Sequence, residues 1–287
     1  MAPLPEALQE VAVVTVADEV WVLGGFDDSI QVSDRVWILA GDDPNTATWR
    51  PGPALPRPMH HHNTAVFDGR LYVLGGLEGS FVPFADAWVL DRAAEAWLEL
   101  PPVPVAMGSA AVGVANGEIL LAGGLTPDTD TLGFAFDPRA ETWRPLPDLP
   151  AARDHAVGAG GDALRVLGGR DNGLANVRDD VWQLVGDTWI PGTPLPTARA
   201  GTAGTTLPDG TVLVAGGEGN PSDPDGVFAE VERYDPLSDA WTVLDPMPTP
   251  RHGTGAAPFA GGVLVPGGAT VQAFRAVDTV EWLVLPD

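Results

Sequence analysis

The segment YVLGG at residues 72–76 decides the fold, because close copies of it recur five more times along the chain. Each copy is an apolar run that ends in a pair of glycines, and neighbouring copies lie 45 to 51 residues apart. The other five are WVLGG (21–25), LLAGG (120–124), RVLGG (165–169), LVAGG (213–217) and LVPGG (264–268). Six copies in one phase identify an internal repeat, and this period is typical of propellers and related repeat architectures.

A tryptophan follows every glycine pair, 15 to 25 residues after its first glycine. In three repeats the tryptophan ends a similar segment: LDRAAEAW (90–97), FDPRAETW (136–143) and YDPLSDAW (234–241). An apolar residue, an Asp-rich turn and a Trp predict a hairpin that joins two strands. Each repeat therefore holds about four short strands, which is the content of one propeller blade.

The composition of each repeat fits this geometry. The first strand is rich in Gly, Ala, Ser and Thr, as expected where strands crowd around a propeller axis. The glycine pairs allow positive φ angles and close backbone approach. Each Trp near the outer strand is expected to fill the wedge between neighbouring blades. No amphipathic helical segment of useful length is present, which excludes a doubly wound α/β fold.

This order of Gly-Gly, an aromatic or apolar residue and then Trp resembles the kelch repeat, over essentially the whole chain. The match is imperfect, because the usual Tyr occurs only as Tyr234, with Phe136 and Leu90 at the matching positions. The resemblance implies an all-β, six-bladed β-propeller of four-stranded blades, which forms a single domain over residues 1–287. The expected blades are about 1–54, 55–102, 103–148, 149–194, 195–246 and 247–287.

The two ends of the chain fall at the same point of the repeat. The chain opens with Pro-Leu-Pro before its first inner strand and ends with Leu-Pro-Asp after its last expected outer strand. We therefore predict that no terminal strand is exchanged to latch the ring. On this prediction, the first and last blades meet by packing alone.

The formal net charge is −24, and all 15 basic residues are Arg. Such a surface repels phosphate backbones and anionic lipid, so neither nucleic acid nor a membrane is an expected partner. The absence of Cys excludes disulfides, thiolate metal sites and cysteine nucleophiles. The first residues lack the features of a signal peptide. We therefore expect a cytoplasmic monomer, or a secreted or periplasmic one if a signal peptide has been removed.

The segments that follow each apolar-Pro pair carry the candidate site residues. The residue at the fifth position is apolar in the first three repeats (Leu8, Met59, Met107) and Arg in the last three (Arg153, Arg199, Arg251). The loop GGRDNG adds Arg170 and Asn172. All five histidines lie in the same segments: His60, His61, His62, His155 and His252. By the repeat geometry, these residues ring one mouth of the central channel.

Guanidinium groups suit the bidentate binding of carboxylate or phosphate. In kelch adaptor proteins, partner peptides commonly dock on the face made by these loops. The resemblance therefore implies that Arg153, Arg199, Arg251 and Arg170 contact an anionic ligand. The alternative is that these Arg side chains bond neighbouring backbone carbonyls. On the first interpretation, replacing the three repeat-position arginines together abolishes partner binding and leaves the fold intact.

Other chemistries remain open or are excluded. Two or three histidines could converge on zinc or another transition metal, and the sequence does not decide this. The pair Asp154-His155 lacks a nucleophile for a hydrolase triad. The copper site of galactose oxidase-like proteins, a Tyr crosslinked to Cys, is excluded by the absence of Cys. Asn220, Asp223 and Asp225 offer oxygen ligands for calcium but are equally good turn residues.

The leading prediction is a non-catalytic binding module without a cofactor. It recognises a peptide, a protein or a small anionic ligand at the Arg/His-lined mouth of the channel. The alternative is a kelch-type enzyme that acts on a sugar or other small metabolite through the same mouth. An enzyme should show a deep pocket with an Asp, Glu or His within hydrogen-bond reach of its ligand. A structural role within a larger assembly is the third hypothesis.

Overall fold

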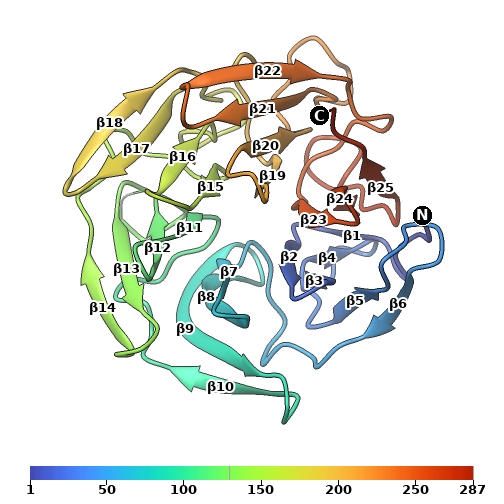
Figure 1. Ribbon diagram of the computed structural model, residues 1–287, viewed down its shortest axis with the longest axis horizontal. Helices are drawn as coiled ribbons and strands as arrows, with labels where there is room; N and C mark the ends of the chain where they lie inside the picture. Colours follow the sequence, from blue (N-terminus) through green and yellow to red (C-terminus); the bar gives the residue numbers. More distant parts are fainter. Residues whose placement is uncertain (129, 287) are drawn as a thin grey trace.

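The computed structural model describes residues 1–128 and 130–286 as six β-sheets arranged in a ring (Figure 1). Each sheet is one blade, and its strands run from the innermost to the outermost in sequence order. The described residues form no helix, so none there has the length and apolar character needed to cross a bilayer. The predicted all-β, six-bladed propeller is confirmed.

The first three blades are four-stranded antiparallel sheets, and the ladder of blade two has a register shift between Leu74 and Gly76. Blade one contains β2 (Ala12–Val16), β3 (Glu19–Leu23), β5 (Val36–Ala40) and β6 (Thr48–Pro51). Blade two contains β7 (Thr64–Phe67), β8 (Arg70–Glu78), β9 (Val82–Asp91) and β10 (Ala96–Leu100). Blade three contains β11 (Ala111–Ala115), β12 (Glu118–Ala122), β13 (Gly133–Asp137) and β14 (Thr142–Pro145).

The last three blades continue the ring. Blade four contains β15 (Val157–Ala159), β16 (Arg165–Leu167), β17 (Val181–Val185) and β18 (Thr188–Gly192). Blade five contains β19 (Ala203–Thr206), β20 (Val212–Ala215), β21 (Val231–Asp235) and β22 (Ala240–Leu244). Blade six contains β23 (Ala257–Phe259), β24 (Gly262–Pro266) and β25 (Val280–Leu283). Two further short strands, β1 (Leu8–Gln9) and β4 (Phe26–Asp27), pair with each other.

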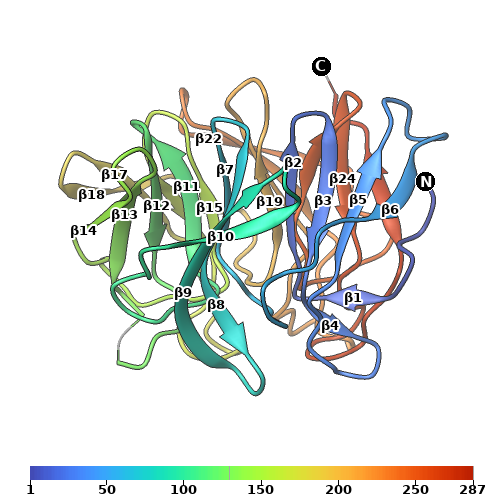
Figure 2. The same ribbon diagram turned by 90° about the horizontal axis from the view of Figure 1, so that it is seen from below.

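The ring has two different faces, because successive strands of a blade are antiparallel. One face carries the tight turns that join the first to the second strand and the third to the fourth; we call it the hairpin face. The other carries the long loops after each glycine pair and the connections between blades; we call it the loop face. In the side view, β1, β4 and the β8–β9 loop lie at the loop face, along the lower edge (Figure 2).

Small residues on the inner strands allow neighbouring blades to approach closely. A Cβ atom at Gly158 of β15 would lie 2.1 Å from the backbone nitrogen of Val112 in β11. The glycine pairs serve the same purpose between blades. A Cβ atom at Gly216 would lie 2.3 Å from the carbonyl oxygen of Arg251. Larger side chains at these positions would therefore force adjacent blades apart.

In blades three to five, the tryptophan of the outer strand bonds the preceding blade. The indole N–H of Trp143 donates to the carbonyl of Pro101 in blade two at 2.9 Å. The indole N–H of Trp189 donates to Pro147 of blade three at 2.9 Å. Trp189 is buried, whereas Trp143 is half-buried. The expected wedge role is thus observed, with different degrees of burial.

Blade six corrects the prediction of four strands in every blade. Its sheet has three strands among the described residues, with β25 as the outermost. Trp282 pairs with Leu264 of β24, so it lies on the third strand and not the fourth. Its indole N–H donates to Phe259 within its own blade at 3.0 Å. The sequence carried a sign of this difference, since Trp282 follows its glycine pair after 15 residues instead of 20 to 25.

The ring closure also differs from the prediction. The N–H groups of Leu4 and Leu8 donate to the carbonyls of Asp278 and Val277 in the last blade, at 2.8 and 3.3 Å. The N–H of Gly268 returns a bond to Leu8 at 2.8 Å. Equivalent backbone hydrogen bonds join other pairs of neighbouring blades. The N-terminal segment therefore completes the boundary between blades six and one in the same way as the boundaries elsewhere in the propeller. The expectation that the terminal blades meet by packing alone was wrong.

Candidate functional site

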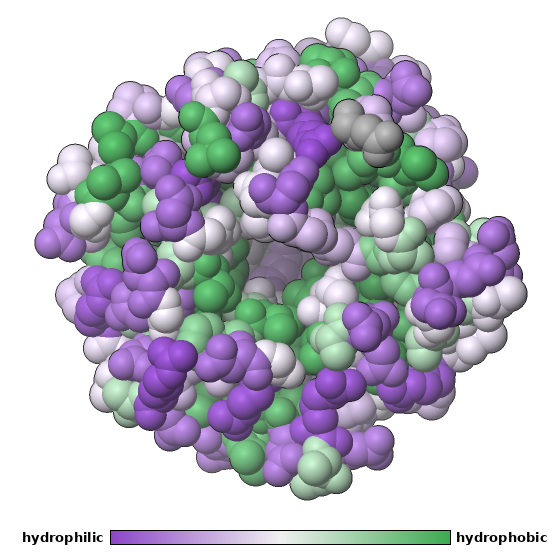
Figure 3. Space-filling view, in the orientation of Figure 1, coloured by the Kyte–Doolittle hydropathy of each residue, from purple (hydrophilic) through white to green (hydrophobic). Residues whose placement is uncertain are grey.

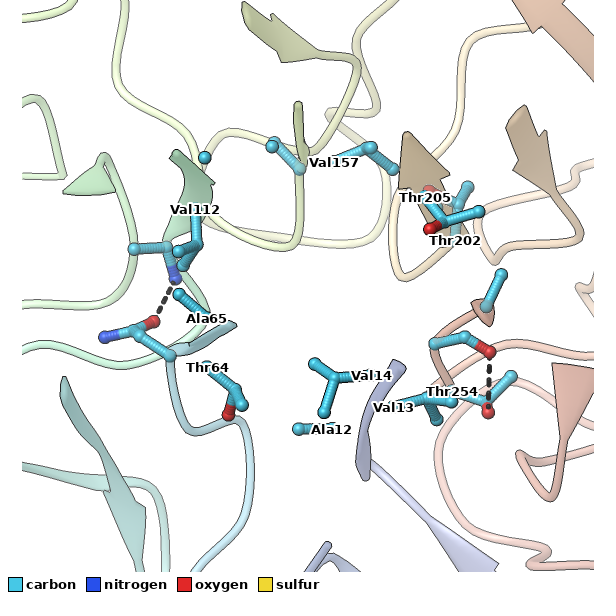
Figure 4. Close-up of a pocket in the computed structure, with 18 of the residues that line it drawn as sticks. Ala12, Val13, Val14, Thr64, Ala65, Val112, Val157, Thr202, Thr205 and Thr254 are labelled. Carbon is cyan, nitrogen blue, oxygen red and sulfur yellow. Dashed lines mark hydrogen bonds between the residues drawn. The ribbon is translucent and has the colours of Figure 1, made fainter. Parts of the chain in front are cut away.

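A channel of about 560 Å³ runs along the propeller axis and is lined by the inner strands of all six blades. The space-filling view shows it as a central hollow on the hairpin face (Figure 3). Figure 4 shows that its wall consists of small side chains such as Ala12, Val14, Thr64, Val112 and Thr205. The Ala, Val and Thr side chains of this wall carry no carboxylate or imidazole; in the channel lining these groups come from Glu10, His61, His62 and His155.

At the loop-face end, six residues from the same repeat position form a hydrogen-bonded ring, which we call the axial ring. Each backbone N–H donates to the carbonyl of the preceding member, and the bonds are 2.5 to 3.3 Å long. The members are Glu10, His61, Ser109, His155, Gly201 and Gly253. The bond from Glu10 to Gly253 closes the circle between the first and last blades.

The backbone of the axial ring favours glycine. All six members have φ between 48° and 65°, the left-handed region that side chains other than Gly occupy at a cost. Two members, Gly201 and Gly253, meet that preference. The other four retain a side chain in a strained conformation, and such strain is concentrated at functional sites in proteins.

Three of these side chains meet across the channel axis. Glu10, His61 and His155 each offer a ligand atom, and these atoms lie within 4.8 Å of one another. The rings of His61 and His155 are 4.7 Å apart, although they belong to blades two and four. The Nε2 atom of His61 lies 3.0 Å from Oε2 of Glu10. The three side chains are between 4% and 11% exposed, so this contact is nearly dry.

Charged side chains surround these three residues. Arg170 bonds Asp154 through Nε at 2.9 Å and Glu218 through Nη1 at 2.5 Å. Asp154 also bonds Nδ1 of His155. Nδ1 of His252 lies 3.6 Å from Glu10 and 3.6 Å from Glu218. The loop-face end of the channel is therefore a buried polar cluster with three carboxylates and one guanidinium.

Burial and mutual repulsion keep several of the imidazoles neutral. The pKa of His60 falls to about 3, because burial and the neighbouring His61 both disfavour its charged form. Burial likewise lowers the pKa of His155, against the opposing effect of Asp154. Burial alone would raise the pKa of Glu10, but the nearby His61 outweighs it and holds that pKa below its usual range. Glu10 is thus a carboxylate at neutral pH.

The three arginines expected to bind a ligand are buried instead. Arg153, Arg199 and Arg251 are at most 1% exposed. Arg199 donates to the carbonyls of Gly216 and Val214 and to the carboxylate of Glu232, at 2.8, 3.1 and 2.5 Å. Arg153 and Arg251 bind backbone carbonyls in the same way. Their donors are already engaged inside the blades, so the expected anion contact is corrected to a structural role.

Packing explains why the repeat position carries an apolar residue in blades one to three and Arg in blades four to six. In blades four to six, the Arg is paired with a carboxylate: Asp180, Glu232 or Glu281. In the first three blades, the apolar residue at this position instead shares a core cluster with an aromatic residue. The apolar pairs are Leu8 with Trp37, Met59 with Trp88 and Met107 with Phe134. In blades five and six, Glu232 and Glu281 take the third-strand position that an aromatic residue takes in the first three blades, so ionic and apolar pairs fill equivalent space there. Blade four keeps Trp182 at that position, and Arg153 pairs with Asp180 two residues earlier.

The other predicted residues divide between the cluster and its surroundings. Arg170, His155 and His252 lie in the polar cluster, and Arg170 is paired rather than free. His60 is fully buried beside the cluster and stacks on Phe26, with ring centroids 4.2 Å apart. His62 is also buried. Asn172 is exposed in the β16–β17 loop. Glu10 and Glu218 belong to the cluster but were not predicted from the sequence.

The loop that offers oxygen ligands for calcium is occupied by its own turn bonds. Oδ1 of Asn220 accepts from the N–H of Ser222 at 3.0 Å, and Oδ1 of Asp223 accepts from the N–H of Asp225 at 2.8 Å. Within the described residues, the group able to hold a metal ion is Glu10, His61 and His155. The loop sequence is thus explained by turn formation.

Beyond the axial ring, three phenylalanines gather on the loop face; we call them the aromatic patch. Phe26, Phe81 and Phe274 come from the loops of blades one, two and six, and their ring centroids are 5.3 to 6.5 Å apart. Phe81 and Phe274 are 41% and 38% exposed. Phe81 also stacks on His60 and His61, at 5.0 and 5.4 Å. The sequence interpretation missed this patch, because its members are isolated aromatics in three distant loops.

The aromatic patch sits on strained loop tips. Phe81 has φ 64°, and Ala273, which precedes Phe274, has φ 84°. Ile30, in the loop after Phe26, has φ 60° and is 51% exposed. A positive φ is unusual for a β-branched or bulky residue. Exposed apolar side chains on strained loops are typical of recognition surfaces.

Comparisons with known proteins agree with this architecture. The model of the Kelch motif matches residues 58–104, 106–150 and 199–248. Kelch-like protein terF from Aspergillus terreus is 36% identical over 95% of this chain and 63% of its own length. Kelch-like protein 34 from Homo sapiens is 30% identical over 80% of this chain and 38% of its own length. The chain thus spans less than two thirds of either relative.

A solved structure supports the same fold. The structure of YjhT superposes with a TM-score of 0.81, covering 100% of this chain and 97% of that one, at 17% sequence identity. Identity at this level shows the fold alone. Together with the motif matches and the kelch-like relatives, it makes this chain a kelch-repeat β-propeller. Kelch-repeat propellers are typically protein-binding modules.

Proposed function

We propose that this chain is a non-catalytic recognition module that binds a peptide segment of a partner protein on its loop face. The observation that carries the proposal is the aromatic patch. Two half-exposed Phe rings are displayed on strained loops at the end of the channel, above a buried polar cluster. Aromatic anchors of this kind commonly dominate the binding energy of protein interfaces.

The charge of the chain favours a basic partner over an acidic one. The net charge is −24, and the predicted anion contacts Arg153, Arg199 and Arg251 are neutralised inside the blades. Asp27 and the exposed Asp28 follow Phe26 directly. An apolar side chain flanked by Lys or Arg would therefore complement the surface, since complementary charge steers association. This ligand replaces the small acidic ligand of the sequence-based prediction.

Selection from a displayed library of random peptides tests the proposal. The bait is the full chain, compared with the double variant Phe81→Ser/Phe274→Ser. We expect selected peptides that contain an apolar or aromatic residue beside Lys or Arg. Their binding to the double variant should weaken by at least about tenfold, because one well-placed aromatic anchor is worth more than 1 kcal/mol.

The matched control removes an apolar side chain from the hairpin face. Leu237 is 96% exposed in the β21–β22 turn, so Leu237→Ser changes surface hydrophobicity without touching the loop face. Selected peptides should bind this variant as they bind the unmodified chain. Peptides that bind both variants equally well, or peptides that are uniformly acidic, would show that the partner does not use the aromatic patch.

A further inference from the structure

The polar cluster at the end of the channel has an unusual arrangement of lone pairs. Nε2 of His60 lies 3.3 Å from the carbonyl oxygen of Gly79, which can only accept a proton. That nitrogen therefore carries the hydrogen of the neutral ring, and Nδ1 of His60 has a lone pair. Nδ1 of His61 lies 2.6 Å from Nδ1 of His60. Because Nδ1 of His60 can only accept, Nδ1 of His61 must carry the hydrogen and donate the bond. Nε2 of a neutral His61 is then left without a hydrogen.

This leaves an unprotonated nitrogen of His61 beside a carboxylate. Nε2 of His61 is buried and has no hydrogen-bond partner, although it lies 3.0 Å from Oε2 of Glu10. Two lone-pair atoms at this distance repel each other unless a cation lies between them or the ring takes up a second proton. The separation is close to that of two neighbouring ligands on one metal ion with bonds of about 2.0–2.2 Å.

His252 repeats the pattern from the other side. Its Nε2 lies 3.0 Å from the carbonyl of Val271, so Nε2 donates and Nδ1 carries the lone pair of the neutral ring. That buried Nδ1 has no hydrogen-bond partner and faces Glu10 and Glu218, 3.6 Å from each. Two buried imidazole nitrogens without hydrogen-bond partners thus lie close to the same carboxylate.

With all of its imidazoles neutral, the cluster lacks two positive charges. Glu10, Asp154 and Glu218 are each at most 11% exposed, and the single guanidinium of Arg170 neutralises one of the three. Buried charge without compensation is strongly unfavourable. One divalent cation would supply the missing charge.

We propose that Glu10, His61 and His155 bind a divalent transition-metal ion of the zinc type at the axial ring. Two imidazoles and one carboxylate form a set that such ions favour over calcium or magnesium. Asp154 holds Nδ1 of His155 and so directs its Nε2 inward, as the carboxylate partners of metal-binding histidines do. The ion would take the place of Arg170 at Nε2 of His155, now 3.1 Å away, while Arg170 keeps its two carboxylates.

The axial ring itself provides the variants for a test. Gly201 and Gly253 occupy the same backbone position as His61 and His155, so the fold accepts Gly there. His61→Gly and His155→Gly each remove one ligand and relieve a positive φ. Ser109→Gly makes the same backbone change at the same position but removes no ligand. It is therefore the matched control.

The experiment uses the full chain, stripped of metal with a chelator, and Zn²⁺ or Co²⁺ alone as the probe. Isothermal titration should show one Zn²⁺ per chain, and Co²⁺ should give the absorption bands of a low-coordinate site. We expect His61→Gly and His155→Gly each to weaken Zn²⁺ binding by more than about 100-fold, since even outer-shell changes cost 10- to 100-fold. Ser109→Gly should bind as the unmodified chain does.

Two results would overturn the proposal. One is a folded chain that binds none of these ions, with His61 observed by NMR as a doubly protonated ring beside Glu10 at neutral pH. The other is Zn²⁺ binding of equal strength in the unmodified chain and in both His variants, which would locate the ion elsewhere. Circular dichroism of each variant confirms that the comparison is made between folded proteins.

Discussion

The guanidinium of Arg199 bonds Gly216 and Val214 of its own blade, while its backbone carbonyl accepts from Gly169 of the preceding blade at 3.0 Å. One residue therefore ties two blades together. Its charge is compensated by Glu232, which is 1% exposed. Removing one partner of such a buried pair leaves the other charge uncompensated, which is more costly than removing both.

Arg199→Met tests this role, because Met occupies the equivalent position in blades two and three. We expect the single variant to lose about 3–5 kcal/mol of unfolding free energy. The double variant Arg199→Met/Glu232→Phe reproduces the Met107–Phe134 pair of blade three and should recover part of that loss. Urea unfolding of these two variants and of the single variant Glu232→Phe measures the difference. A single variant as stable as the unmodified chain, or a double variant with the sum of two separate losses, would contradict the structural role.

For single residues, the sequence predicted location better than function. It placed His61, His62 and His155 at one end of the channel, where the structure has them, but the repeat-position arginines lie inside the blades. It could not show that Arg199 finds Glu232, because the partner lies 33 positions away. A usable signal was present nonetheless: Glu232 and Glu281 replace aromatic residues only in blades that carry Arg.

Among the elements, the outer strands show how the wedge between blades is filled unevenly. Trp189 of β18 is 9% exposed and bonds Pro147 of blade three. Trp143 of β14 makes the equivalent bond to Pro101 but is only half-buried, and it packs on Phe136 at a centroid distance of 4.8 Å. The contribution of each Trp should follow the area it buries.

Replacing each Trp by Ala measures these contributions. Trp189→Ala should cost about 3–5 kcal/mol, the range for a large buried aromatic residue. Trp143→Ala should cost less, because part of its ring already contacts water in the folded state. Thermal or urea unfolding of the two variants gives the comparison. If Trp143→Ala lost as much unfolding free energy as Trp189→Ala, or more, the buried area of the indole ring would not determine its contribution to stability.

The strand content was predictable for five blades and not for the sixth. The glycine pairs, the turn residues and the Trp fixed the hairpins wherever the full repeat was present. In blade six, the segment between Gly268 and Trp282 is too short for a third strand, a turn and a fourth strand. Trp282 was therefore predicted on a fourth strand, whereas it lies on the third strand, β25, which is the outermost strand of its sheet in the described structure.

For the molecule as a whole, the ring is what brings residues distant in sequence to one axis. Glu10, His61 and His155 meet only because six blades close and place one repeat position at the centre. Distances between blades do not follow from the sequence, so the convergence of His61 with His155 could not be predicted. Neither the aromatic patch nor the charge balance of the polar cluster follows from local patterns, since both depend on side chains contributed by separate loops.

Hydrogen exchange of the axial-ring amides, followed by NMR, tests this account most directly. The amides of Glu10 and His61 bridge the first blade to its neighbours, through Gly253 and Glu10. If the ring is closed as described, they should exchange as slowly as the amides of Ser109 and Gly201, and all should open only with global unfolding. Rapid exchange at Glu10 and His61, with Ser109 and Gly201 still protected, would show that the first blade is not joined to its two neighbours.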